Sequence, residues 1–186
     1  MNKNLSDYVK VYNLMSHETC VDAVNQLNAS KFEEHRLYNS RTKTIENKPG
    51  LANTYYGHID IMPKLMTDIY SALSKYVLED IKFDWFKGWE GYTIPRFNRY
   101  TKGQSLYNHC DHIHDIFDGQ RKGIPKITCV GFLNDDYVGG EFVMFEDEII
   151  QTKPGDIIVF PSVFLFPHKV NEVTEGTRYT FASWCW

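Results

Sequence analysis

The sequence lacks the markers of several common protein classes. Its four cysteines, Cys20, Cys110, Cys129 and Cys185, form no Cys-x-x-Cys pair. Two disulfides would be compatible with that number, but a chain of 186 residues does not need them, so we expect reduced thiols. The first residues lack an apolar signal core, and no segment approaches the roughly eighteen apolar residues of a membrane span. These absences favour a soluble, cytoplasmic protein without a membrane partner.

Concentrated positive charge is also absent. The formal net charge is −4 and the pI is near 6.0, and the short basic run from Arg96 to Arg99 is mixed with uncharged residues. A nucleic-acid partner would need a local basic patch, so none is expected. Aromatic residues, in contrast, are plentiful, with twelve Tyr, twelve Phe and four Trp. Such side chains suit half-buried pleated surfaces, which favours a β-sandwich or barrel.

The N-terminal part contains two helical patterns. Residues 8–15 alternate like a strand, Ser16 then caps an amphipathic helix, and residues 29–53 are polar and irregular. A longer helix is predicted over about 60–80, and it should cover a sheet. Its apolar stripe consists of residues spaced four apart: Ile61, Leu65, Ile69, Leu73 and Val77.

From about residue 83 the pattern changes to short strands and turns. The expected strands are 87–94, 96–100, 126–133, 141–145, 157–160, 168–170 and 178–184, with turns at Gly139-Gly140 and at 153–156. No repeat, low-complexity tract or linker divides the chain. We expect one domain over 1–186, mainly β with covering helices (α+β), in which about 1–90 form the helical cover and outer strands and about 91–186 a barrel core.

The triplet His109-Cys110-Asp111 carries the strongest chemical signal. Two imidazoles and one carboxylate are the ligands of mononuclear non-haem iron(II) oxygenases, and they leave room for a bidentate oxo-acid and dioxygen. On an extended strand His109 and Asp111 point to the same side, and Cys110 points away. We therefore interpret His109 and Asp111 as candidate metal ligands.

A second triplet, His58-Ile59-Asp60, has the same spacing in different surroundings. The next residues begin an amphipathic helix with Pro63 at or near its first turn. Asp60 is therefore expected to cap that helix and His58 to lie in a loop.

The third ligand is expected at His168. His17 and His35 lie in the N-terminal cover, and His112 and His114 follow the metal-binding triplet, where the chain should be leaving the barrel. His168 belongs to a late strand, and in a barrel with this order of strands it should lie beside the strand that carries His109.

Arg178 lies ten residues after His168 among apolar neighbours, with no evident acidic partner on its strand. A buried guanidinium is costly unless it is paired. A dicarboxylate co-substrate whose far carboxylate accepts a bidentate hydrogen bond would remove that cost. The plainer alternative is a surface arginine on an edge strand.

Several short motifs occur in a fixed order along the second half of the chain. They are Tyr100, Gly103, His109-x-Asp111, residues 132–141, residues 153–156, Phe160-Pro161-Ser162, His168-x-Val170, Val173-x-x-Gly176-x-Arg178 and Trp184. From about residue 92 to 186 this series resembles the 2-oxoglutarate- and iron(II)-dependent dioxygenases of the prolyl 4-hydroxylase type. The resemblance implies a double-stranded β-helix (jelly-roll) barrel with iron held by His109, Asp111 and His168. It also implies that Arg178 binds the C5 carboxylate of 2-oxoglutarate.

The resemblance implies further residues around the co-substrate. They are Tyr100, which matches a tyrosine that hydrogen-bonds 2-oxoglutarate, Trp184, which matches a tryptophan lining the site, and Thr180 and Leu133. Phe132 stands where many relatives have a second tyrosine, so that hydrogen bond is absent or comes from Tyr100 or Thr180. Leu106 also replaces a frequent tyrosine. An arginine at 178 resembles oxygen-sensing and bacterial prolyl hydroxylases rather than collagen-type ones.

The chemistry implied by the resemblance is hydroxylation of an unactivated C–H bond, with a peptidyl proline as the favoured substrate. 2-Oxoglutarate and dioxygen would be consumed, succinate and carbon dioxide released, and ascorbate would be a supporting reductant. Two polar segments, 38–54 and 113–125, are expected to frame the substrate entrance. The sequence does not indicate an oligomeric state.

Other functions remain open at this point. A hydroxylase of a free amino acid or other small molecule would keep the same metal site in a closed pocket. A nucleic-acid demethylase would normally carry a second arginine shortly after the first, and no Arg or Lys follows Arg178. A non-enzymatic cupin-like module or a zinc hydrolase could use the same ligands, but neither explains Arg178.

Overall fold

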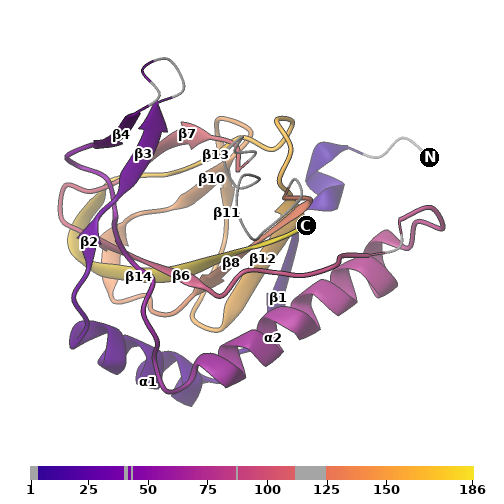
Figure 1. Ribbon diagram of the computed structural model, residues 1–186, viewed down its shortest axis with the longest axis horizontal. Helices are drawn as coiled ribbons and strands as arrows, with labels where there is room; N and C mark the ends of the chain where they lie inside the picture. Colours follow the sequence, from indigo (N-terminus) through magenta and orange to yellow (C-terminus); the bar gives the residue numbers. More distant parts are fainter. Residues whose placement is uncertain (1–3, 40–41, 43, 87, 112–124) are drawn as a thin grey trace.

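Two antiparallel sheets pack face to face, and two helices cover the outer face of the larger one (Figure 1). The computed structural model describes residues 4–186 apart from 40–41, 43, 87 and 112–124. Within those residues the larger sheet has the order β1-β12-β8-β14-β6-β5-β2, with β9 paired to β14, and the smaller has the order β11-β10-β13-β7. The prediction of a mainly β fold with covering helices is confirmed.

The bounds of the elements follow the chain. They are a 3-10 turn (Leu5–Tyr8), β1 (Lys10–Asn13), α1 (His17–Asn28), β2 (Glu33–Glu34), β3 (Arg36–Asn39), β4 (Thr44–Asn47), β5 (Asn53–Tyr55), α2 (Met62–Ser74), a π-helical segment (Lys75–Ile81), β6 (Arg96–Thr101), β7 (Leu106–His109), β8 (Ile127–Phe132), β9 (Tyr137–Gly139), β10 (Phe142–Met144), β11 (Glu148–Ile150), β12 (Asp156–Pro161), β13 (His168–Val170) and β14 (Val173–Cys185). β3 and β4 form a separate hairpin.

The two helices form an outer layer because each buries one apolar face. The Ser16 side chain accepts a hydrogen bond from the Thr19 backbone N–H at 3.1 Å and caps α1 as predicted. All five residues of the predicted α2 stripe belong to the core beneath the helices or pack against it. None of the described helices is long and apolar enough to cross a membrane.

Strand alternation separates the core beneath the helices from the core between the sheets. Cys129 of β8 and Val159 of β12 join the first core, whereas their neighbours Val130 and Ile158 join the second. The four cysteines are all free, as expected for reduced thiols. The inward-facing set surrounds the cavity described below.

Two predictions of secondary structure are wrong. Residues 29–53 are not irregular, because β2, β3 and β4 lie within them and β5 begins at Asn53. In the described part of 87–94 no strand forms, and Tyr92 makes only an isolated bridge to Cys185. Two glycines interrupt this segment and Pro95 follows it, and both residue types weaken a continuous ladder.

The predicted cap of the second helix is also wrong. The N-cap of α2 is Ile61, which makes no side-chain cap hydrogen bond, and Pro63 lies in the first turn as expected. The backbone N–H of Asp60 instead donates to Gln26 Oε1 at 2.6 Å. The loop before α2 is thus tied to α1, a contact far apart in sequence that no local capping pattern reveals.

β7 and β13 bring the two halves of the site together. β7 lies at an edge of the smaller sheet and pairs with β13 in the register His168 to His109. The register shifts between His168 and Val170, so the ladder is irregular immediately beside the histidines. The predicted return of the late strand beside the triplet is observed.

Candidate metal and co-substrate site

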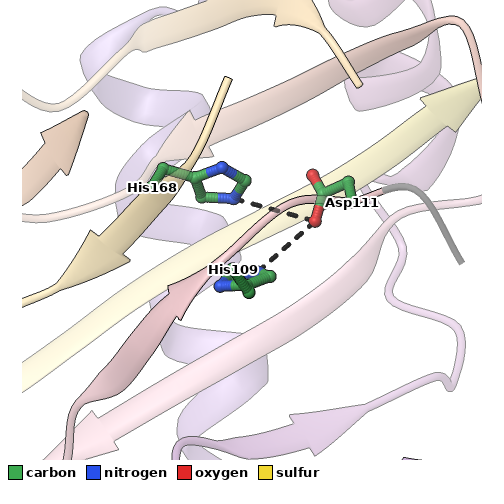
Figure 2. A group of neighbouring side chains, drawn as sticks. All are labelled: His109, Asp111 and His168. Atoms are coloured by element: carbon green, nitrogen blue, oxygen red, sulfur yellow. Dashed lines mark ion pairs between the residues drawn. The ribbon is translucent and has the colours of Figure 1, made fainter. Parts of the chain in front are cut away.

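His109, Asp111 and His168 converge between the sheets (Figure 2). His109 ends β7, Asp111 follows two residues later, and His168 begins β13. The Nε2 atoms of His109 and His168 lie 3.4 and 3.7 Å from Asp111 Oδ1. The three ligand atoms lie within 4.8 Å of one another, and no other such group of ligands occurs among the described residues. This arrangement could bind one metal ion.

The backbone fixes which imidazole nitrogen faces the centre. His109 Nδ1 lies 2.9 Å from the Tyr107 carbonyl oxygen, and His168 Nδ1 lies 3.2 Å from that of Phe166. A carbonyl oxygen only accepts, so each Nδ1 carries the proton and donates it. Both Nε2 lone pairs are therefore free for a metal.

Electrostatics favour the metal-binding protonation states of His168 and Asp111. Burial lowers the pKa of His168 and so favours its neutral form. Burial would by itself raise the pKa of Asp111, but its close contacts with the imidazoles of His168 and His109 outweigh burial, and the pKa falls below its ordinary value. A neutral imidazole and a carboxylate are the binding forms of these ligands.

A buried pair of hydroxyls orients the other oxygen of Asp111. Thr128 Oγ1 donates to Asp111 Oδ2 at 2.9 Å and lies 2.8 Å from Ser162 Oγ. Both hydroxyl residues are almost fully buried. Oδ1 is thus left facing the two histidines. The sequence analysis missed Thr128 and Ser162, and their inward positions on β8 and just after β12 were the only available signal.

Replacing Thr128 with valine should lower metal affinity by roughly 10- to 100-fold, because valine keeps the shape but cannot donate to Asp111. Thr128→Ser should retain most of the affinity, since it keeps the hydroxyl. Titration with iron(II) under nitrogen, alongside the free energy of unfolding, separates positioning from folding. Equal affinities in the valine and serine variants would contradict this role.

Arg178 is buried in the same cavity without an acidic partner in the described part of the chain. It is 1% exposed, and its Nε and Nη2 atoms have no hydrogen-bond partner. Its guanidinium carbon lies 4.9 Å from the ring centre of Tyr100 and 5.3 Å from that of Phe132. These rings offset part of the charge. Nε and Nη2 still lack an acceptor among the described residues, so the site has unused capacity for an anion.

Most of the predicted site residues line one cavity between the sheets. The predicted site residues that line it are Tyr100, His109, Asp111, His168, Arg178, Thr180 and Trp184. Leu106 also lines it, and Tyr107 is exposed with its ring edge-on to His109, 5.8 Å between centres.

Leu133 does not line this cavity, which corrects its assignment to the co-substrate. It packs in the core beneath the helices. Its neighbour Phe132 instead joins the core between the sheets. Successive strand residues face opposite sides, so Phe132 and Leu133 cannot both face the metal.

None of the other described histidines belongs to the ligand group. His58 is exposed in a loop, as expected, and its carbonyl accepts a hydrogen bond from Tyr55. His17 lies in α1, and His35 joins no ligand group among the described residues. His112 and His114 lie outside the described residues.

Sequence relatives match the half of the chain that contains the site. Residues 95–186 match the model of the 2OG-Fe(II) oxygenase superfamily. A PKHD-type hydroxylase of Delftia acidovorans is 38% identical over 96 residues, which are 48% of this chain and 42% of the relative. One of Hyphomonas neptunium is 43% identical over 100 residues, 50% and 42% of the two chains. The chain therefore matches less than half the length of these curated relatives.

Solved structures match over nearly the whole chain. A Trichoplax adhaerens prolyl hydroxylase, in complex with a hypoxia inducible factor peptide, superposes with a TM-score of 0.71 at 16% identity, covering 97% of this chain and 84% of that one. A Pseudomonas putida prolyl-4-hydroxylase gives 0.65 at 16% identity, covering 96% and 91%. At this identity the likeness shows the fold, and the predicted double-stranded β-helix is confirmed. By its sequence match and its His-Asp-His group, the region 95–186 of this chain belongs to the 2OG-Fe(II) oxygenase superfamily.

Proposed function

We propose that this protein is a 2-oxoglutarate- and iron(II)-dependent dioxygenase that hydroxylates an unactivated C–H bond, with a peptidyl proline as substrate. The observation that carries the proposal is Arg178, which is buried without an acidic partner among the described residues and lines the same cavity as His109, Asp111 and His168. A metal site alone would suit a binding module or a zinc hydrolase. A buried cation beside it needs an anionic ligand as well.

The residues present fit iron(II) and 2-oxoglutarate. Two neutral imidazoles and one carboxylate on one side leave open positions for an oxo-acid and dioxygen. The free Nε and Nη2 donors of Arg178 suit a bidentate contact with the far carboxylate of 2-oxoglutarate. Thr180, 1% exposed beside the cavity, and Tyr100 would supply the polar contacts that a second tyrosine makes in many relatives.

Each part of the chain has a separate task in this reaction. Bound iron would supply the activation of dioxygen, whose two oxygen atoms enter the hydroxylated product and succinate while 2-oxoglutarate loses carbon dioxide. His109, Asp111 and His168 would hold the ion, and Thr128 would keep Asp111 in place. The apolar walls at Val130, Phe142 and Val170 limit water around the centre.

The peptide substrate is supported by the likeness in fold to a prolyl hydroxylase in complex with a peptide fragment. The predicted entrance segment 38–54 includes Lys48, whose Nζ lies 5.5 Å from the ring centre of Tyr107, the residue edge-on to His109. The hairpin β3–β4 projects from the body of the molecule near this end (Figure 1). Most of the second predicted segment, 113–125, lies outside the described residues.

The test is a gain of oxygen measured by mass spectrometry. The iron-loaded protein, with 2-oxoglutarate and ascorbate in air, should add roughly 16 Da, one oxygen atom, to a proline residue in a library of proline-containing peptides. Succinate should form in equal amount. Omitting 2-oxoglutarate is the control for non-enzymatic oxidation.

The outcomes separate the proposal from its alternatives. A gain of oxygen only on free amino acids or another small molecule would replace the peptide substrate by the small-molecule one. Failure to form succinate with any substrate, despite stoichiometric iron, would reject the oxygenase itself and favour a cupin-like binding module.

A further inference from the structure

A second arginine lines the same cavity, at the opposite end of one wall. Alternate residues of two paired strands face this wall: Arg96, Asn98 and Tyr100 of β6, and Arg178, Thr180, Ala182 and Trp184 of β14. In the register of these strands Arg178 lies opposite Tyr100, whereas Arg96 lies opposite Ala182. The Cα atoms of the two arginines are therefore four strand positions apart, about 13 Å at roughly 3.3 Å per residue.

The two guanidinium groups lie over different rings, that of Arg178 over Tyr100 and that of Arg96 over Trp184, so we expect each to bind a separate group. The five-carbon chain of 2-oxoglutarate spans roughly half of the Cα separation. Its far carboxylate belongs to the buried Arg178 end. Arg96 lies at the more accessible end, since it is only partly buried whereas Arg178 is 1% exposed. Arg96 is thus available to the hydroxylation substrate, which would bind after the co-substrate.

Arg96 is held in place by neutral groups. Its Nε donates to Asn98 Oδ1 at 3.1 Å, and its guanidinium carbon lies 4.7 Å from the ring centre of Trp184. No salt bridge joins it to an acidic side chain among the described residues. These contacts fix the plane of the guanidinium without neutralising it, which is the arrangement suited to a planar anion.

The charges inside the cavity leave Arg96 unbalanced. Asp111 is the one carboxylate among the described lining residues. With iron(II) and 2-oxoglutarate bound, the charges of the ion, Asp111, Arg178 and the two co-substrate carboxylates cancel. The positive charge of Arg96 remains, and a substrate with one negative group would compensate it.

We propose that Arg96 binds a carboxylate of the hydroxylation substrate, and so selects substrates that carry a carboxylate close to the reacting C–H bond. The inference rests on the proposed function and adds a substrate class to it. That carboxylate belongs to a free amino acid, to a C-terminal residue, or to an acidic side chain beside the reacting residue. Lys48, whose Nζ lies over the ring of Tyr107, would add attraction for such a group.

A binding experiment tests this without relying on turnover. The protein is loaded with manganese(II) in place of iron and with N-oxalylglycine, an inert analogue of 2-oxoglutarate. Three kinds of probe are titrated calorimetrically: free amino acids, N-acetyl amino acids, and proline dipeptides with a neighbouring Glu. Each is paired with a neutral counterpart, the corresponding amide or the Gln peptide. At least one acid should bind about thirtyfold or more tightly than its neutral counterpart, because a desolvated guanidinium contact is lost in the latter.

The Arg96→Gln variant should reduce that preference to about threefold or less. Arg99→Gln is the matched control, because Arg99 lies on the same strand and its guanidinium carbon is 4.5 Å from the ring centre of Phe32, on the face away from the cavity. It removes the same charge and should keep the preference for acids. Binding of N-oxalylglycine, measured first, verifies that both variants retain the co-substrate site.

Each outcome has one reading. No preference for acids in the wild-type protein, or an undiminished preference in Arg96→Gln, would overturn the role of Arg96. A preference that depends on Arg96, together with no gain of oxygen on any probe, would support the carboxylate site and count against the oxygenase. The class of the preferred probe distinguishes a free amino acid from a C-terminal or acidic residue of a peptide.

Discussion

Replacing His109, Asp111 or His168 with alanine should reduce 2-oxoglutarate turnover by at least about a hundredfold. Removing the groups that only orient metal ligands typically costs 10- to 100-fold in metal affinity or activity, so removing a ligand itself should cost more. Each of the three supplies one atom to a group that spans less than 4.8 Å. The measurement is succinate formation at saturating 2-oxoglutarate, together with iron content after dialysis.

His58→Ala is the matched control for these variants, because His58 shares the His-x-Asp spacing but is exposed in a loop. Its turnover should stay near that of the unmodified protein. A loss of activity in His58→Ala, with activity retained in His109→Ala, would show that the wrong triplet has been assigned to the metal.

Arg178→Ala should weaken 2-oxoglutarate binding by about 2 to 4 kcal/mol, which is roughly 30- to 1000-fold, because a desolvated bidentate contact is lost. Iron should still bind, since Arg178 is not a ligand. Arg178→Lys should be intermediate, because lysine keeps the charge without the planar fork. The absorption band of the iron–oxo-acid complex, titrated under nitrogen, reports the affinity directly.

Arg178→Met separates the charge from the volume of the side chain. Without 2-oxoglutarate this variant should unfold with equal or greater free energy than the unmodified protein, because the buried guanidinium lacks an acidic partner in the described structure. Its affinity for 2-oxoglutarate should nevertheless fall as in Arg178→Ala. Equal co-substrate affinities in all four proteins would remove Arg178 from the site.

Spacing along the chain predicted what depends on local geometry. His109 and Asp111 converge because alternate residues of an extended chain face the same side, and the apolar stripe of α2 is buried because helical periodicity brings its members to one face. The alternation of strand residues also explains the wrong assignment of Leu133 to the co-substrate, because neighbouring residues face opposite sides of a sheet. Leu133 faces the helices because Phe132 faces the cavity side.

Contacts between distant strands could not be predicted in this way. Thr128 meets Ser162 because β8 and β12 pair in a register that aligns Ile127 with Pro161, and no local pattern specifies that register. Arg96 and Arg99 read as one mixed basic run in the sequence. The strand sends them to opposite faces, and the pairing of β6 with β14 then places Arg96 beside Trp184.

Because β7 lies at the edge of its sheet, a bound metal ion would also hold β7 against β13. β7 has a hydrogen-bonded neighbour on one side only among the described strands, and its ladder with β13 is irregular next to the histidines. A metal ion held by His109 and His168 would join these two strands across that irregularity. Part of the free energy of metal binding would then offset the cost of ordering β7. An affinity measured for the ion is therefore a lower bound on the strength of the ligand set itself.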